Sequence, residues 1–468
     1  MVYLLKLTTK CFLQHTKPQT FQRSISALYV TGDKATKNYA PLQPYMDFEE
    51  TFKDTKQLEE SIKARGLSIN LNELKDKYTK YKIVHEQMQK LEIDRDLVYK
   101  KVKEANQSGV ATKEEIEAMK TKGMQLRNDL KALKAQKYPI EEDFIYSFLN
   151  LPNILHADCP IKNIEKLMYR SRTPRCEEER PSHLSFTDLI RFHTNDRYYM
   201  LGAPAEFDIF STQAMANYFV EKGGFMQTSN PDFVRLVILE ASGTPLETHH
   251  LVKEKDLASE INRAYLTGGA TFEGFLGAFA RLVVYPTVLP LPCVVAGRRY
   301  EKVKGAKDQP ANLFTATQTN AVQTFVATKT AEQANEYLDK ILNLAVDFYK
   351  ELGVHFRIVY VDASALTIAE CLRANIEMYS PAEKRYICVG SVSNYSDYVS
   401  KRIMFCIREK KDYAFPHLVG GPVLYTTRLI AVLLENGVKL EDCKLLGDSA
   451  IGGEVPNKAT NEFKDLFK

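Results

Sequence analysis

Cys388 and His417 are a cysteine and a histidine that could in principle perform covalent chemistry together. A thiol beside an imidazole can act as a nucleophile when a third group orients the ring. Cys388, however, lies among apolar residues in a predicted strand, "RYICVGSVS" (385–393), and the sequence offers no orienting partner. None of the eight cysteines stands in a CxxC or Cys/His spacing, so no metal site is expected. Neither a Walker loop nor a G-x-G-x-x-G sequence is present, and no cofactor is expected.

A second set of candidates is a group of lysines that could contact phosphates: Lys100, Lys101, Lys103 and Lys113. Residues 66–137 hold 16 Lys plus Arg against 11 Asp plus Glu, a difference of +5, whereas the whole chain carries only +4. Lysines on an extended surface supply non-specific, salt-dependent affinity for nucleic acid. The alternative is the solvated face of a coiled coil, and charge alone does not choose between the two.

These lysines fall near the tip of a predicted pair of helices. A helical pattern begins after Asn70, a suitable N-cap, and breaks at "NQSGVAT" (106–112). A second, heptad pattern starts at Glu114 and is expected to end at Tyr138-Pro139. Two such helices joined by about seven residues must fold back as an antiparallel hairpin. The sequence therefore predicts a helical arm, within residues 45–140, that projects from a larger body.

The body is predicted over residues 150–468, where short runs of β-branched and aromatic residues alternate with Gly and Pro. Successive short strands joined by turns favour an antiparallel sheet with helices packed on it, so the expected fold class is α+β. Strands are expected at 281–289, 312–318, 322–328, 356–363, 385–393 and 402–409, and helices at 212–223, 331–352, 364–376 and 427–437.

The first 32 residues contain no Asp or Glu and carry Lys6, Lys10, Lys17 and Arg23 among several Ser and Thr. This composition is typical of a mitochondrial transit peptide, expected at residues 1–30, and Arg23-Ser24-Ile25-Ser26 resembles a matrix-protease cleavage site. A disordered tail is the alternative. No apolar run approaches the roughly 18 residues that a membrane-spanning helix needs, so no membrane partner is expected.

Several stretches resemble the seryl-tRNA synthetases, a class II synthetase family, over nearly all of the chain after the leader. "SNYSDYVSKR" (393–402) is similar to the family's S-N-x-x-D-[YF]-Q-x-R-R, and Gly421 with Arg428 seven residues later matches motif 3. "GGFMQTSNPDFV" (223–234) resembles motif 1, a dimer-interface element, with Pro231 at the motif proline. The resemblance implies a class II antiparallel sheet flanked by helices and an antiparallel two-helix coiled-coil arm that contacts tRNA.

The departures from the family pattern lie where the resemblance places ATP. Motif 2 should read F-R-x-E and, after a loop, H-Q-F-x-K-x-E, and its arginine holds the α-phosphate. Here "VAGRRYEKVKG" (295–305) stands without that order, and the register of Arg298 and Arg299 is left open. In "TQTNAVQTF" (317–325), Asn320 and Gln323 stand at carboxylate positions.

The region that the resemblance assigns to serine departs as well. Cys388 replaces the carboxylate of the family's E-[VI]-S-S-C-S-N. Gly420-Gly421-Pro422 stands where N-G-[ST] precedes the motif 3 arginine, so Gly420 and Pro422 replace an amide and a hydroxyl. Glu273 is a candidate, in a shifted register, for the amine-binding glutamate of T-[SA]-E.

These losses bear on catalysis because adenylate formation needs Arg and Mg²⁺ at the phosphate, and Mg²⁺ needs carboxylate oxygens. The resemblance therefore implies a catalytically degenerate paralogue. Such a subunit would bind and stabilise the active mitochondrial seryl-tRNA synthetase as a heterodimer in the matrix and support the charging of mitochondrial tRNA-Ser. Two alternatives stay open: a divergent but active mitochondrial serine–tRNA ligase, and a free-standing mitochondrial RNA-binding protein.

Overall fold

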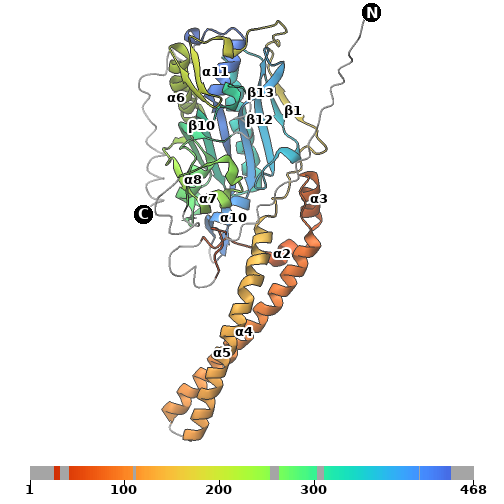
Figure 1. The fold of residues 1–468 in the computed structure, drawn as a ribbon, viewed down its shortest axis with the longest axis vertical. Helices are drawn as coiled ribbons and strands as arrows, with labels where there is room; N and C mark the ends of the chain where they lie inside the picture. Colours follow the sequence, from red (N-terminus) through yellow and green to blue (C-terminus); the bar gives the residue numbers. More distant parts are fainter. Residues whose placement is uncertain are drawn as a thin grey trace, which may run out of the picture.

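The computed structural model of the chain describes residues 26–31, 42–108, 112–252, 263–302, 310–409 and 412–443. Most of the predicted leader, residues 1–25, lies outside these ranges. The described residues form a helical arm and a body built on a large β-sheet (Figure 1). Within the described part of the chain, no helix is both long and apolar enough to cross a membrane.

The arm is a hairpin of two long helices, α4 (Leu71–Ser108) and α5 (Lys113–Leu149). The ion pairs Lys77–Asp143 (2.9 Å) and Lys134–Glu92 (3.7 Å) join them, so the start of α4 lies beside the end of α5. This arrangement confirms the antiparallel arm that the sequence predicted. Two short helices lie beside its base, α2 (Phe48–Lys53) and α3 (Lys56–Ala64).

Local signals define where the arm helices begin. The Oδ1 atom of Asn70 accepts hydrogen bonds from the backbone N–H groups of Asn72 (3.1 Å) and Glu73 (3.3 Å), which caps α4 as predicted. Thr112 and Glu115 form a reciprocal capping box at the start of α5. Gly66, with a φ of 68°, ends the turn after α3 in a conformation that favours glycine.

The second arm helix does not end at Tyr138-Pro139, as the sequence predicted. Helix α5 continues through Pro139 to Leu149. A proline inside a helix costs about 3 kcal/mol. The turns that follow it bury Phe144, Ile145 and Leu149 at the base of the arm. Each buried side chain of this size contributes about 1.5–3 kcal/mol, so burial outweighs the cost of the proline.

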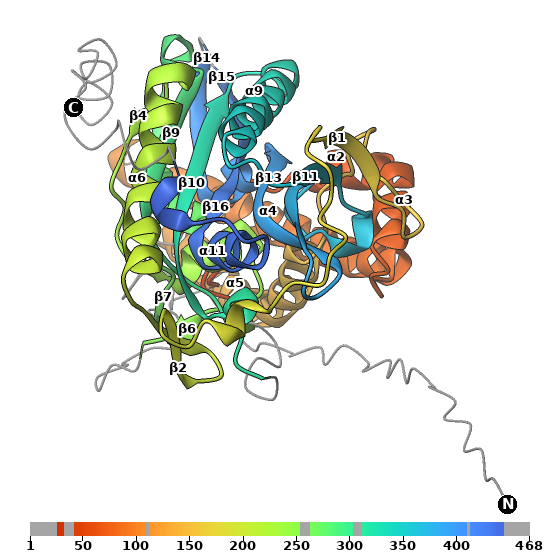
Figure 2. The ribbon, with the colours of Figure 1, turned by 90° about the horizontal axis from the view of Figure 1, so that it is seen from above.

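The body contains one eight-stranded sheet in the order β1-β11-β12-β13-β16-β10-β9-β4. All neighbouring strands are antiparallel except β4 and β9. Figure 2 shows β9 and β4 near one edge and β1 and β11 near the other. The strands are β1 (Lys166–Arg170), β4 (Met226–Gln227), β9 (Leu291–Tyr300), β10 (Gln318–Thr328), β11 (Phe356–Tyr360), β12 (Leu372–Ser380), β13 (Arg385–Ser396) and β16 (His417–Tyr425).

Helices cover both faces of this sheet. Three pack against one face, α6 (Ala203–Gly223), α9 (Ala331–Lys350) and α11 (Thr426–Glu435). Three shorter ones lie on the other, α7 (Leu236–Ser242), α8 (Phe272–Phe279) and α10 (Tyr398–Ile403). Small sheets complete the body: β2 (Ile190–Thr194) with β3 (Arg197–Met200); β5 (Phe233–Arg235), β7 (Ala264–Leu266) and β6 (His250–Leu251); β15 (Asp412–Ala414), β14 (Cys406–Glu409) and β8 (Val283–Val284).

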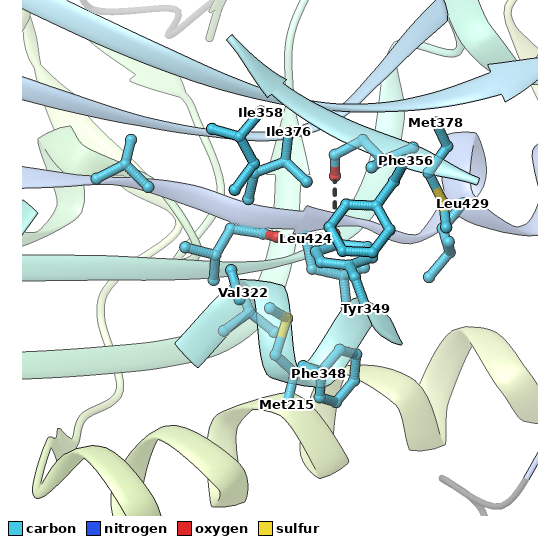
Figure 3. Close-up of a cluster of buried hydrophobic side chains, with 14 of the residues drawn as sticks. Met215, Val322, Phe348, Tyr349, Phe356, Ile358, Ile376, Met378, Leu424 and Leu429 are labelled. Carbon is cyan, nitrogen blue, oxygen red and sulfur yellow. Dashed lines mark hydrogen bonds between the residues drawn. The ribbon is translucent and has the colours of Figure 1, made fainter. Parts of the chain in front are cut away.

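The core between the sheet and its long helices is apolar and well filled. Figure 3 shows Met215 of α6 beside Phe348 of α9, and Tyr349 of α9 beside Phe356 of β11; Leu429 of α11 belongs to the same cluster. The Tyr349 hydroxyl donates to the backbone carbonyl of Val423 over 2.9 Å, so its polar end is satisfied although the side chain is fully buried. This sheet-and-helix core confirms the α+β class.

Three predicted elements were wrong. Residues 364–376, predicted as a helix, contain a 3-10 turn, η7 (Ala363–Ala365), and the start of β12. Strand β12 pairs with β11 and β13, and this two-sided ladder overrides a helix-like apolar period. The stretch 281–289 keeps only β8 as strand, and 312–318 holds the 3-10 turn η6 (Leu313–Thr315).

Candidate functional site

The positions that the sequence assigned to a nucleotide and an amino acid lie on both faces of the sheet. Strands β9 and β10 pair so that Arg299 stands opposite Thr319 and Arg298 stands opposite Asn320. Directly opposite residues of a ladder point to the same face, and successive residues alternate. Arg299 therefore points to the α8 face, whereas Arg298 and Asn320 point to the α6 face.

The register of motif 2 corrects the sequence interpretation. Arg299 and Glu301 lie two residues apart on one strand end, with Arg299 Nε 3.2 Å from Glu301 Oε2. The sequence therefore keeps an R-x-E order as Arg299-Tyr300-Glu301, and only the preceding aromatic residue is replaced, by Arg298. Burial alone would raise the pKa of Glu301, but the charges of Arg299 and Arg428 outweigh it and hold that pKa below its usual value.

Tyr425, the last residue of β16, stands beside both arginines of this cluster. Its ring centre is 4.4 Å from the guanidinium carbon of Arg428 and 5.7 Å from that of Arg299, within the range of cation–π contacts. The tyrosine is only 7 % exposed. One buried ring of the chain itself therefore engages the two cations that motifs 2 and 3 would direct at a phosphate.

Cys388 is placed beside the same cluster but is not activated. Its backbone carbonyl accepts a hydrogen bond from Arg428 Nη1 (3.1 Å), and its thiol donates to the carbonyl of Gly390 (3.3 Å). Burial raises the pKa of this thiol, which keeps it protonated near neutral pH. His417 stands beyond Ser396 at the far end of β13, where its ring contacts the Ser396 hydroxyl. The two residues therefore do not form a nucleophile and base.

Glu273 lies on the same face as Arg299, in the first turn of α8. Thr271 caps that helix, so Thr271-Phe272-Glu273 keeps a T-x-E order with Phe272 in the middle. The buried carboxylate of Glu273 accepts a hydrogen bond from the Thr244 hydroxyl (2.7 Å). Burial lowers the pKa of the neighbouring His249, and the charge of Glu273 opposes that shift.

Asn320 belongs to a separate cluster on the opposite face. Its Nδ2 donates to Asp208 Oδ2 of α6 over 2.8 Å, and the Thr426 hydroxyl donates to the other oxygen of the same carboxylate. Arg298 Nη1 lies 3.9 Å from Asp208 Oδ2. Burial raises the pKa of Asp208. Asn320 and Arg298 thus hold α6 and α11 against the sheet and do not face Arg299.

Gln323 and the glycines of motif 3 are tightly enclosed. Gln323 is fully buried, and its Nε2 donates to the carbonyl of Thr324 (2.9 Å). Pro422 stands opposite Gln323 in the ladder. A Cβ atom added to Gly420 would lie 2.2 Å from the carbonyl oxygen of Thr324. An amide side chain therefore cannot occupy position 420 unless the backbone moves.

The residues present do not fit the magnesium ion that adenylate formation would require. The remaining carboxylates near Arg299 already have partners, since Glu301 pairs with Arg299 and Glu273 accepts from Thr244. The Cys388 thiol is protonated, and a thiol is in any case a poor ligand for this hard cation. Over the described residues, no group of three or more His, Cys, Asp or Glu is arranged to hold a metal ion.

Comparisons with known proteins agree with this fold. The profile of the seryl-tRNA synthetase N-terminal domain matches residues 46–155. The serine–tRNA synthetase-like protein Slimp of Drosophila melanogaster is 52 % identical over 464 residues, which cover 98 % of this chain and 100 % of that protein. The chain belongs to the seryl-tRNA synthetase family.

More distant members are similar over most of their length. The mitochondrial serine–tRNA ligase of Mus musculus is 25 % identical over 456 residues, 91 % of this chain and 86 % of that protein. The crystal structure of seryl-tRNA synthetase from Pyrococcus horikoshii complexed with ATP matches with a TM-score of 0.72 at 19 % identity, covering 84 % of this chain and 94 % of that one. The second match concerns the fold alone.

Within this family fold, the four lysines of the arm lie exposed near its distal end: Lys100, Lys101, Lys103 and Lys113. None of them forms an ion pair with another described residue. Tyr99, 71 % exposed, lies next to them. The sequence interpretation did not single out this tyrosine, which adds an aromatic face to a basic surface.

The motif 1 region of the family fold presents apolar side chains to solvent. Pro231 lies exposed just before β5, and Phe233 within β5 is also exposed. On α6, Ile209 and Phe210 are 62 % and 46 % exposed. Exposed apolar side chains of this size on one segment are typical of an interaction surface.

The sequence analysis did not identify several residues of the site. Glu301 could have been found, because it stands two residues after Arg299 as R-x-E requires. Tyr425 and His249 gave no signal, because only the fold brings them to Arg299.

Proposed function

We propose that this chain is a non-aminoacylating subunit that associates with the active mitochondrial seryl-tRNA synthetase and helps it to charge mitochondrial tRNA-Ser. One observation carries the proposal: the charged groups around Arg299 are paired within the chain, although the two ring nitrogens of His249 and the Gln323 Oε1 atom have no hydrogen-bond partner among the described residues. Tyr425 engages Arg299 and Arg428, Glu301 pairs with Arg299, and Glu273 accepts from Thr244. The arm tip and the motif 1 region, in contrast, are open to partners.

The main alternative is a divergent but active serine–tRNA ligase. The retained Arg299-Tyr300-Glu301, Glu273 and Arg428 favour it. Against it stand the lost carboxylates at Cys388 and Gln323, because a missing transition-state donor alone costs about two to three orders of magnitude in rate.

Serine-dependent ATP–pyrophosphate exchange separates the two proposals. We expect the purified chain to show no exchange above a blank without enzyme, while the active mitochondrial synthetase of the same species serves as the positive control. The variant Cys388→Glu should stay silent as well, because Gly420 has no room for the missing amide. Clear exchange by the unmodified chain would establish the active ligase.

We propose that the arm binds RNA through phosphates. Its lysine-rich tip is exposed, and each cation that neutralises a phosphate releases counterions. Charge reversal of Lys100, Lys101 and Lys103 should weaken binding to all RNAs about equally. It should also reduce the slope of log affinity against log salt by about two to three, because each neutralised phosphate contributes roughly 0.7–0.9 to that slope.

The matched control reverses three exposed lysines of the body, Lys222, Lys340 and Lys439. These changes alter the net charge equally but lie away from the arm. Equal losses of affinity for both triple variants would favour a diffuse charge effect, and unchanged affinity of the tip variant would favour the solvated coiled-coil face.

The proposed heterodimer rests on the exposed apolar side chains of motif 1 and of α6, the helix that leads into it. Stable dimers of this kind bury more than about 2,000 Å², which isolated exposed side chains such as Ile209 and Phe210 would help to supply. Ile209→Asp should abolish co-purification with the active synthetase, whereas Tyr413→Asp, at an exposed aromatic residue of β15, should not. A self-sufficient homodimer, with tRNA-Ser charging untouched by depletion of the chain, would contradict the proposal.

The third candidate, a free-standing mitochondrial RNA-binding protein, is separated by the same co-purification. It predicts a chain that binds RNA but brings down no synthetase subunit. A mitochondrial location is supported by the acid-free leader and by similarity to proteins named as mitochondrial ligases. Import of the full chain into isolated mitochondria, with protection from added protease, tests the matrix location.

A further inference from the structure

The described residues nearest to the N-terminus are an integral part of the body. Ala27 and Leu28 are 3 % and 1 % exposed, in the same core as Phe144 of α5 and Leu239 of α7. Segment 26–31 precedes the arm in the sequence, yet it packs where arm and body meet. Removing it would expose apolar surface on both.

One carboxylate holds the start of this segment. Glu240 Oε2 of α7 accepts hydrogen bonds from the Ser26 hydroxyl (2.8 Å) and from the backbone N–H groups of Ala27 (2.8 Å) and Leu28 (3.0 Å). Hydrogen bonds to an ionised acceptor are about twice as strong as neutral ones. Glu240 therefore anchors the first three residues of the segment through hydrogen bonds to one carboxylate oxygen.

The rest of the segment is tied to the arm. The Tyr29 hydroxyl donates to Glu141 Oε1 (2.9 Å), and the Thr31 hydroxyl donates to Glu142, both on α5. Tyr146 of α5 approaches Ser26, whose backbone hydrogen-bonds its hydroxyl. Segment 26–31 thus bridges α7 of the body and α5 of the arm.

The sequence places a protease signal directly before this segment. Arg23 stands three residues before Ser26 in a leader without acidic residues. Resting on the proposed mitochondrial import, we propose that a matrix protease hydrolyses the Ile25–Ser26 peptide bond and that Glu240 receives the new N-terminus. Water supplies the hydroxyl that completes the Ile25 carboxyl group and the proton that completes the Ser26 amine.

Processing at this bond changes the charge that faces Glu240. In the precursor, the Ser26 nitrogen belongs to a neutral amide; in the processed chain it is an α-amino group, which is protonated below about pH 7.7–8.0. The new ammonium belongs to the residue whose hydroxyl already donates to Glu240 (2.8 Å), so it adds a favourable charge interaction to the three hydrogen bonds already present. The buried Arg402 also places positive charge near Glu240. A cut after Leu28 would instead discard the buried anchor.

N-terminal sequencing by mass spectrometry of the chain recovered from mitochondria tests the position of the cut. We expect Ser26 as the first residue, and any other first residue overturns the assignment. Absence of the chain from mitochondria would instead refute the import that the proposed function requires. The two failures are therefore distinguishable.

Hydrogen exchange on purified chains that start at Ser26 tests whether Glu240 holds the segment in place. Glu240→Gln, which removes the charge but keeps an oxygen acceptor, should speed amide exchange of residues 27–30 at least tenfold relative to the parent. Glu247→Gln, at an exposed position just after α7, is the matched control and should leave it unchanged. Equal exchange in the parent and Glu240→Gln overturns the role of Glu240.

Discussion

Arg65 fastens the base of the arm to the body, and its removal should loosen that joint. The side chain is 6 % exposed and follows α3. Its guanidinium donates to the carbonyls of Thr367 (2.6 Å), Glu370 (2.5 Å) and Asn153 (3.2 Å). The perturbation is Arg65→Met, which keeps the apolar stem and removes every donor.

The expected loss of unfolding free energy depends on which hydrogen-bond donors each carbonyl keeps in the variant. The carbonyl of Asn153 keeps the Ser61 hydroxyl (2.8 Å), and that of Thr367 keeps the Glu370 N–H (3.3 Å). The carbonyl of Glu370 would remain buried and lose the donor that Arg65 supplies. A buried acceptor without a donor costs about 1–3 kcal/mol. Each of the three other broken hydrogen bonds, which include the one from Arg65 Nε to the Ser61 hydroxyl (3.2 Å), costs about 0.5–1.5 kcal/mol, so we expect about 2.5–7.5 kcal/mol in all.

Urea unfolding and hydrogen exchange measure this effect. A chain of this size need not unfold in two states, so the first transition is the one to compare. Exchange should rise at the end of α3 and around Asn153 and stay unchanged in α9. Arg65→Lys retains one donor group and should recover about half of the loss. Lys63→Met, exposed two residues earlier, is the matched control and should have no effect.

The reasoning is refuted if Arg65→Met costs less than about 1 kcal/mol, which is below the cost of one stranded carbonyl. It is also refuted if Lys63→Met is as damaging as Arg65→Met. Equal values for Arg65→Lys and Arg65→Met would show that the planar fork of the guanidinium contributes everything and the single donor nothing.

Further substitutions test the remnant site and its support. Tyr425→Ala removes the ring that contacts both guanidinium groups, which keep their bonds to Glu301 and to the Cys388 carbonyl, and should give measurable ATP binding by calorimetry where the parent shows none; equal binding by both would contradict the occlusion by Tyr425. Gly421→Ala places a Cβ atom 2.2 Å from the carbonyl oxygen of Ser391 and should cost about 3 kcal/mol or more in urea unfolding, whereas Gly277→Ala, in open space on α8, should gain about 0.5–1 kcal/mol. Burial lowers the pKa of His249 below its usual 6.5, so the unfolded chain takes up that proton first. Stability should therefore fall as pH drops below about 6.5, and the fall should be smaller in His249→Asn, as unfolding midpoints at pH 7.5 and 5.5 would show. His183→Ala removes the imidazole that lies 2.7 Å from the buried Glu435 carboxylate, which keeps the Ser380 hydroxyl as a donor, and should cost about 1–3 kcal/mol, measured as a lowered melting temperature.

The arm was the most predictable part of the fold because its stability is local. The N-cap at Asn70, the heptad pattern of the second helix and the helix-breaking residues 106–112 can each be recognised from neighbouring residues in the sequence. The one error, at Pro139, came from a distant cause. Residues 144–149 pack against the body, and no local rule anticipates that burial.

The sheet was harder to predict because partners lie far apart in sequence. Residues 364–376 carry a helix-like period, yet β12 gains partners on both sides from β11 and β13. In the site, a family motif was enough to single out Arg428 and Cys388. Which face each residue points to depends on strand register, and so Arg298 and Asn320 were grouped with Arg299 although the ladder sends them to the opposite side.

The length of the arm amplifies small changes of angle at its base. Helix α4 has 38 residues, which corresponds to about 57 Å at 1.5 Å per residue. A tilt of about 5° at the base would carry the lysines at the far end through about 5 Å, more than the roughly 3.4 Å that one nucleotide of a duplex DNA strand advances along the helix axis. The stiffness of the joint between arm and body would therefore set which phosphates the proposed RNA-binding lysines contact.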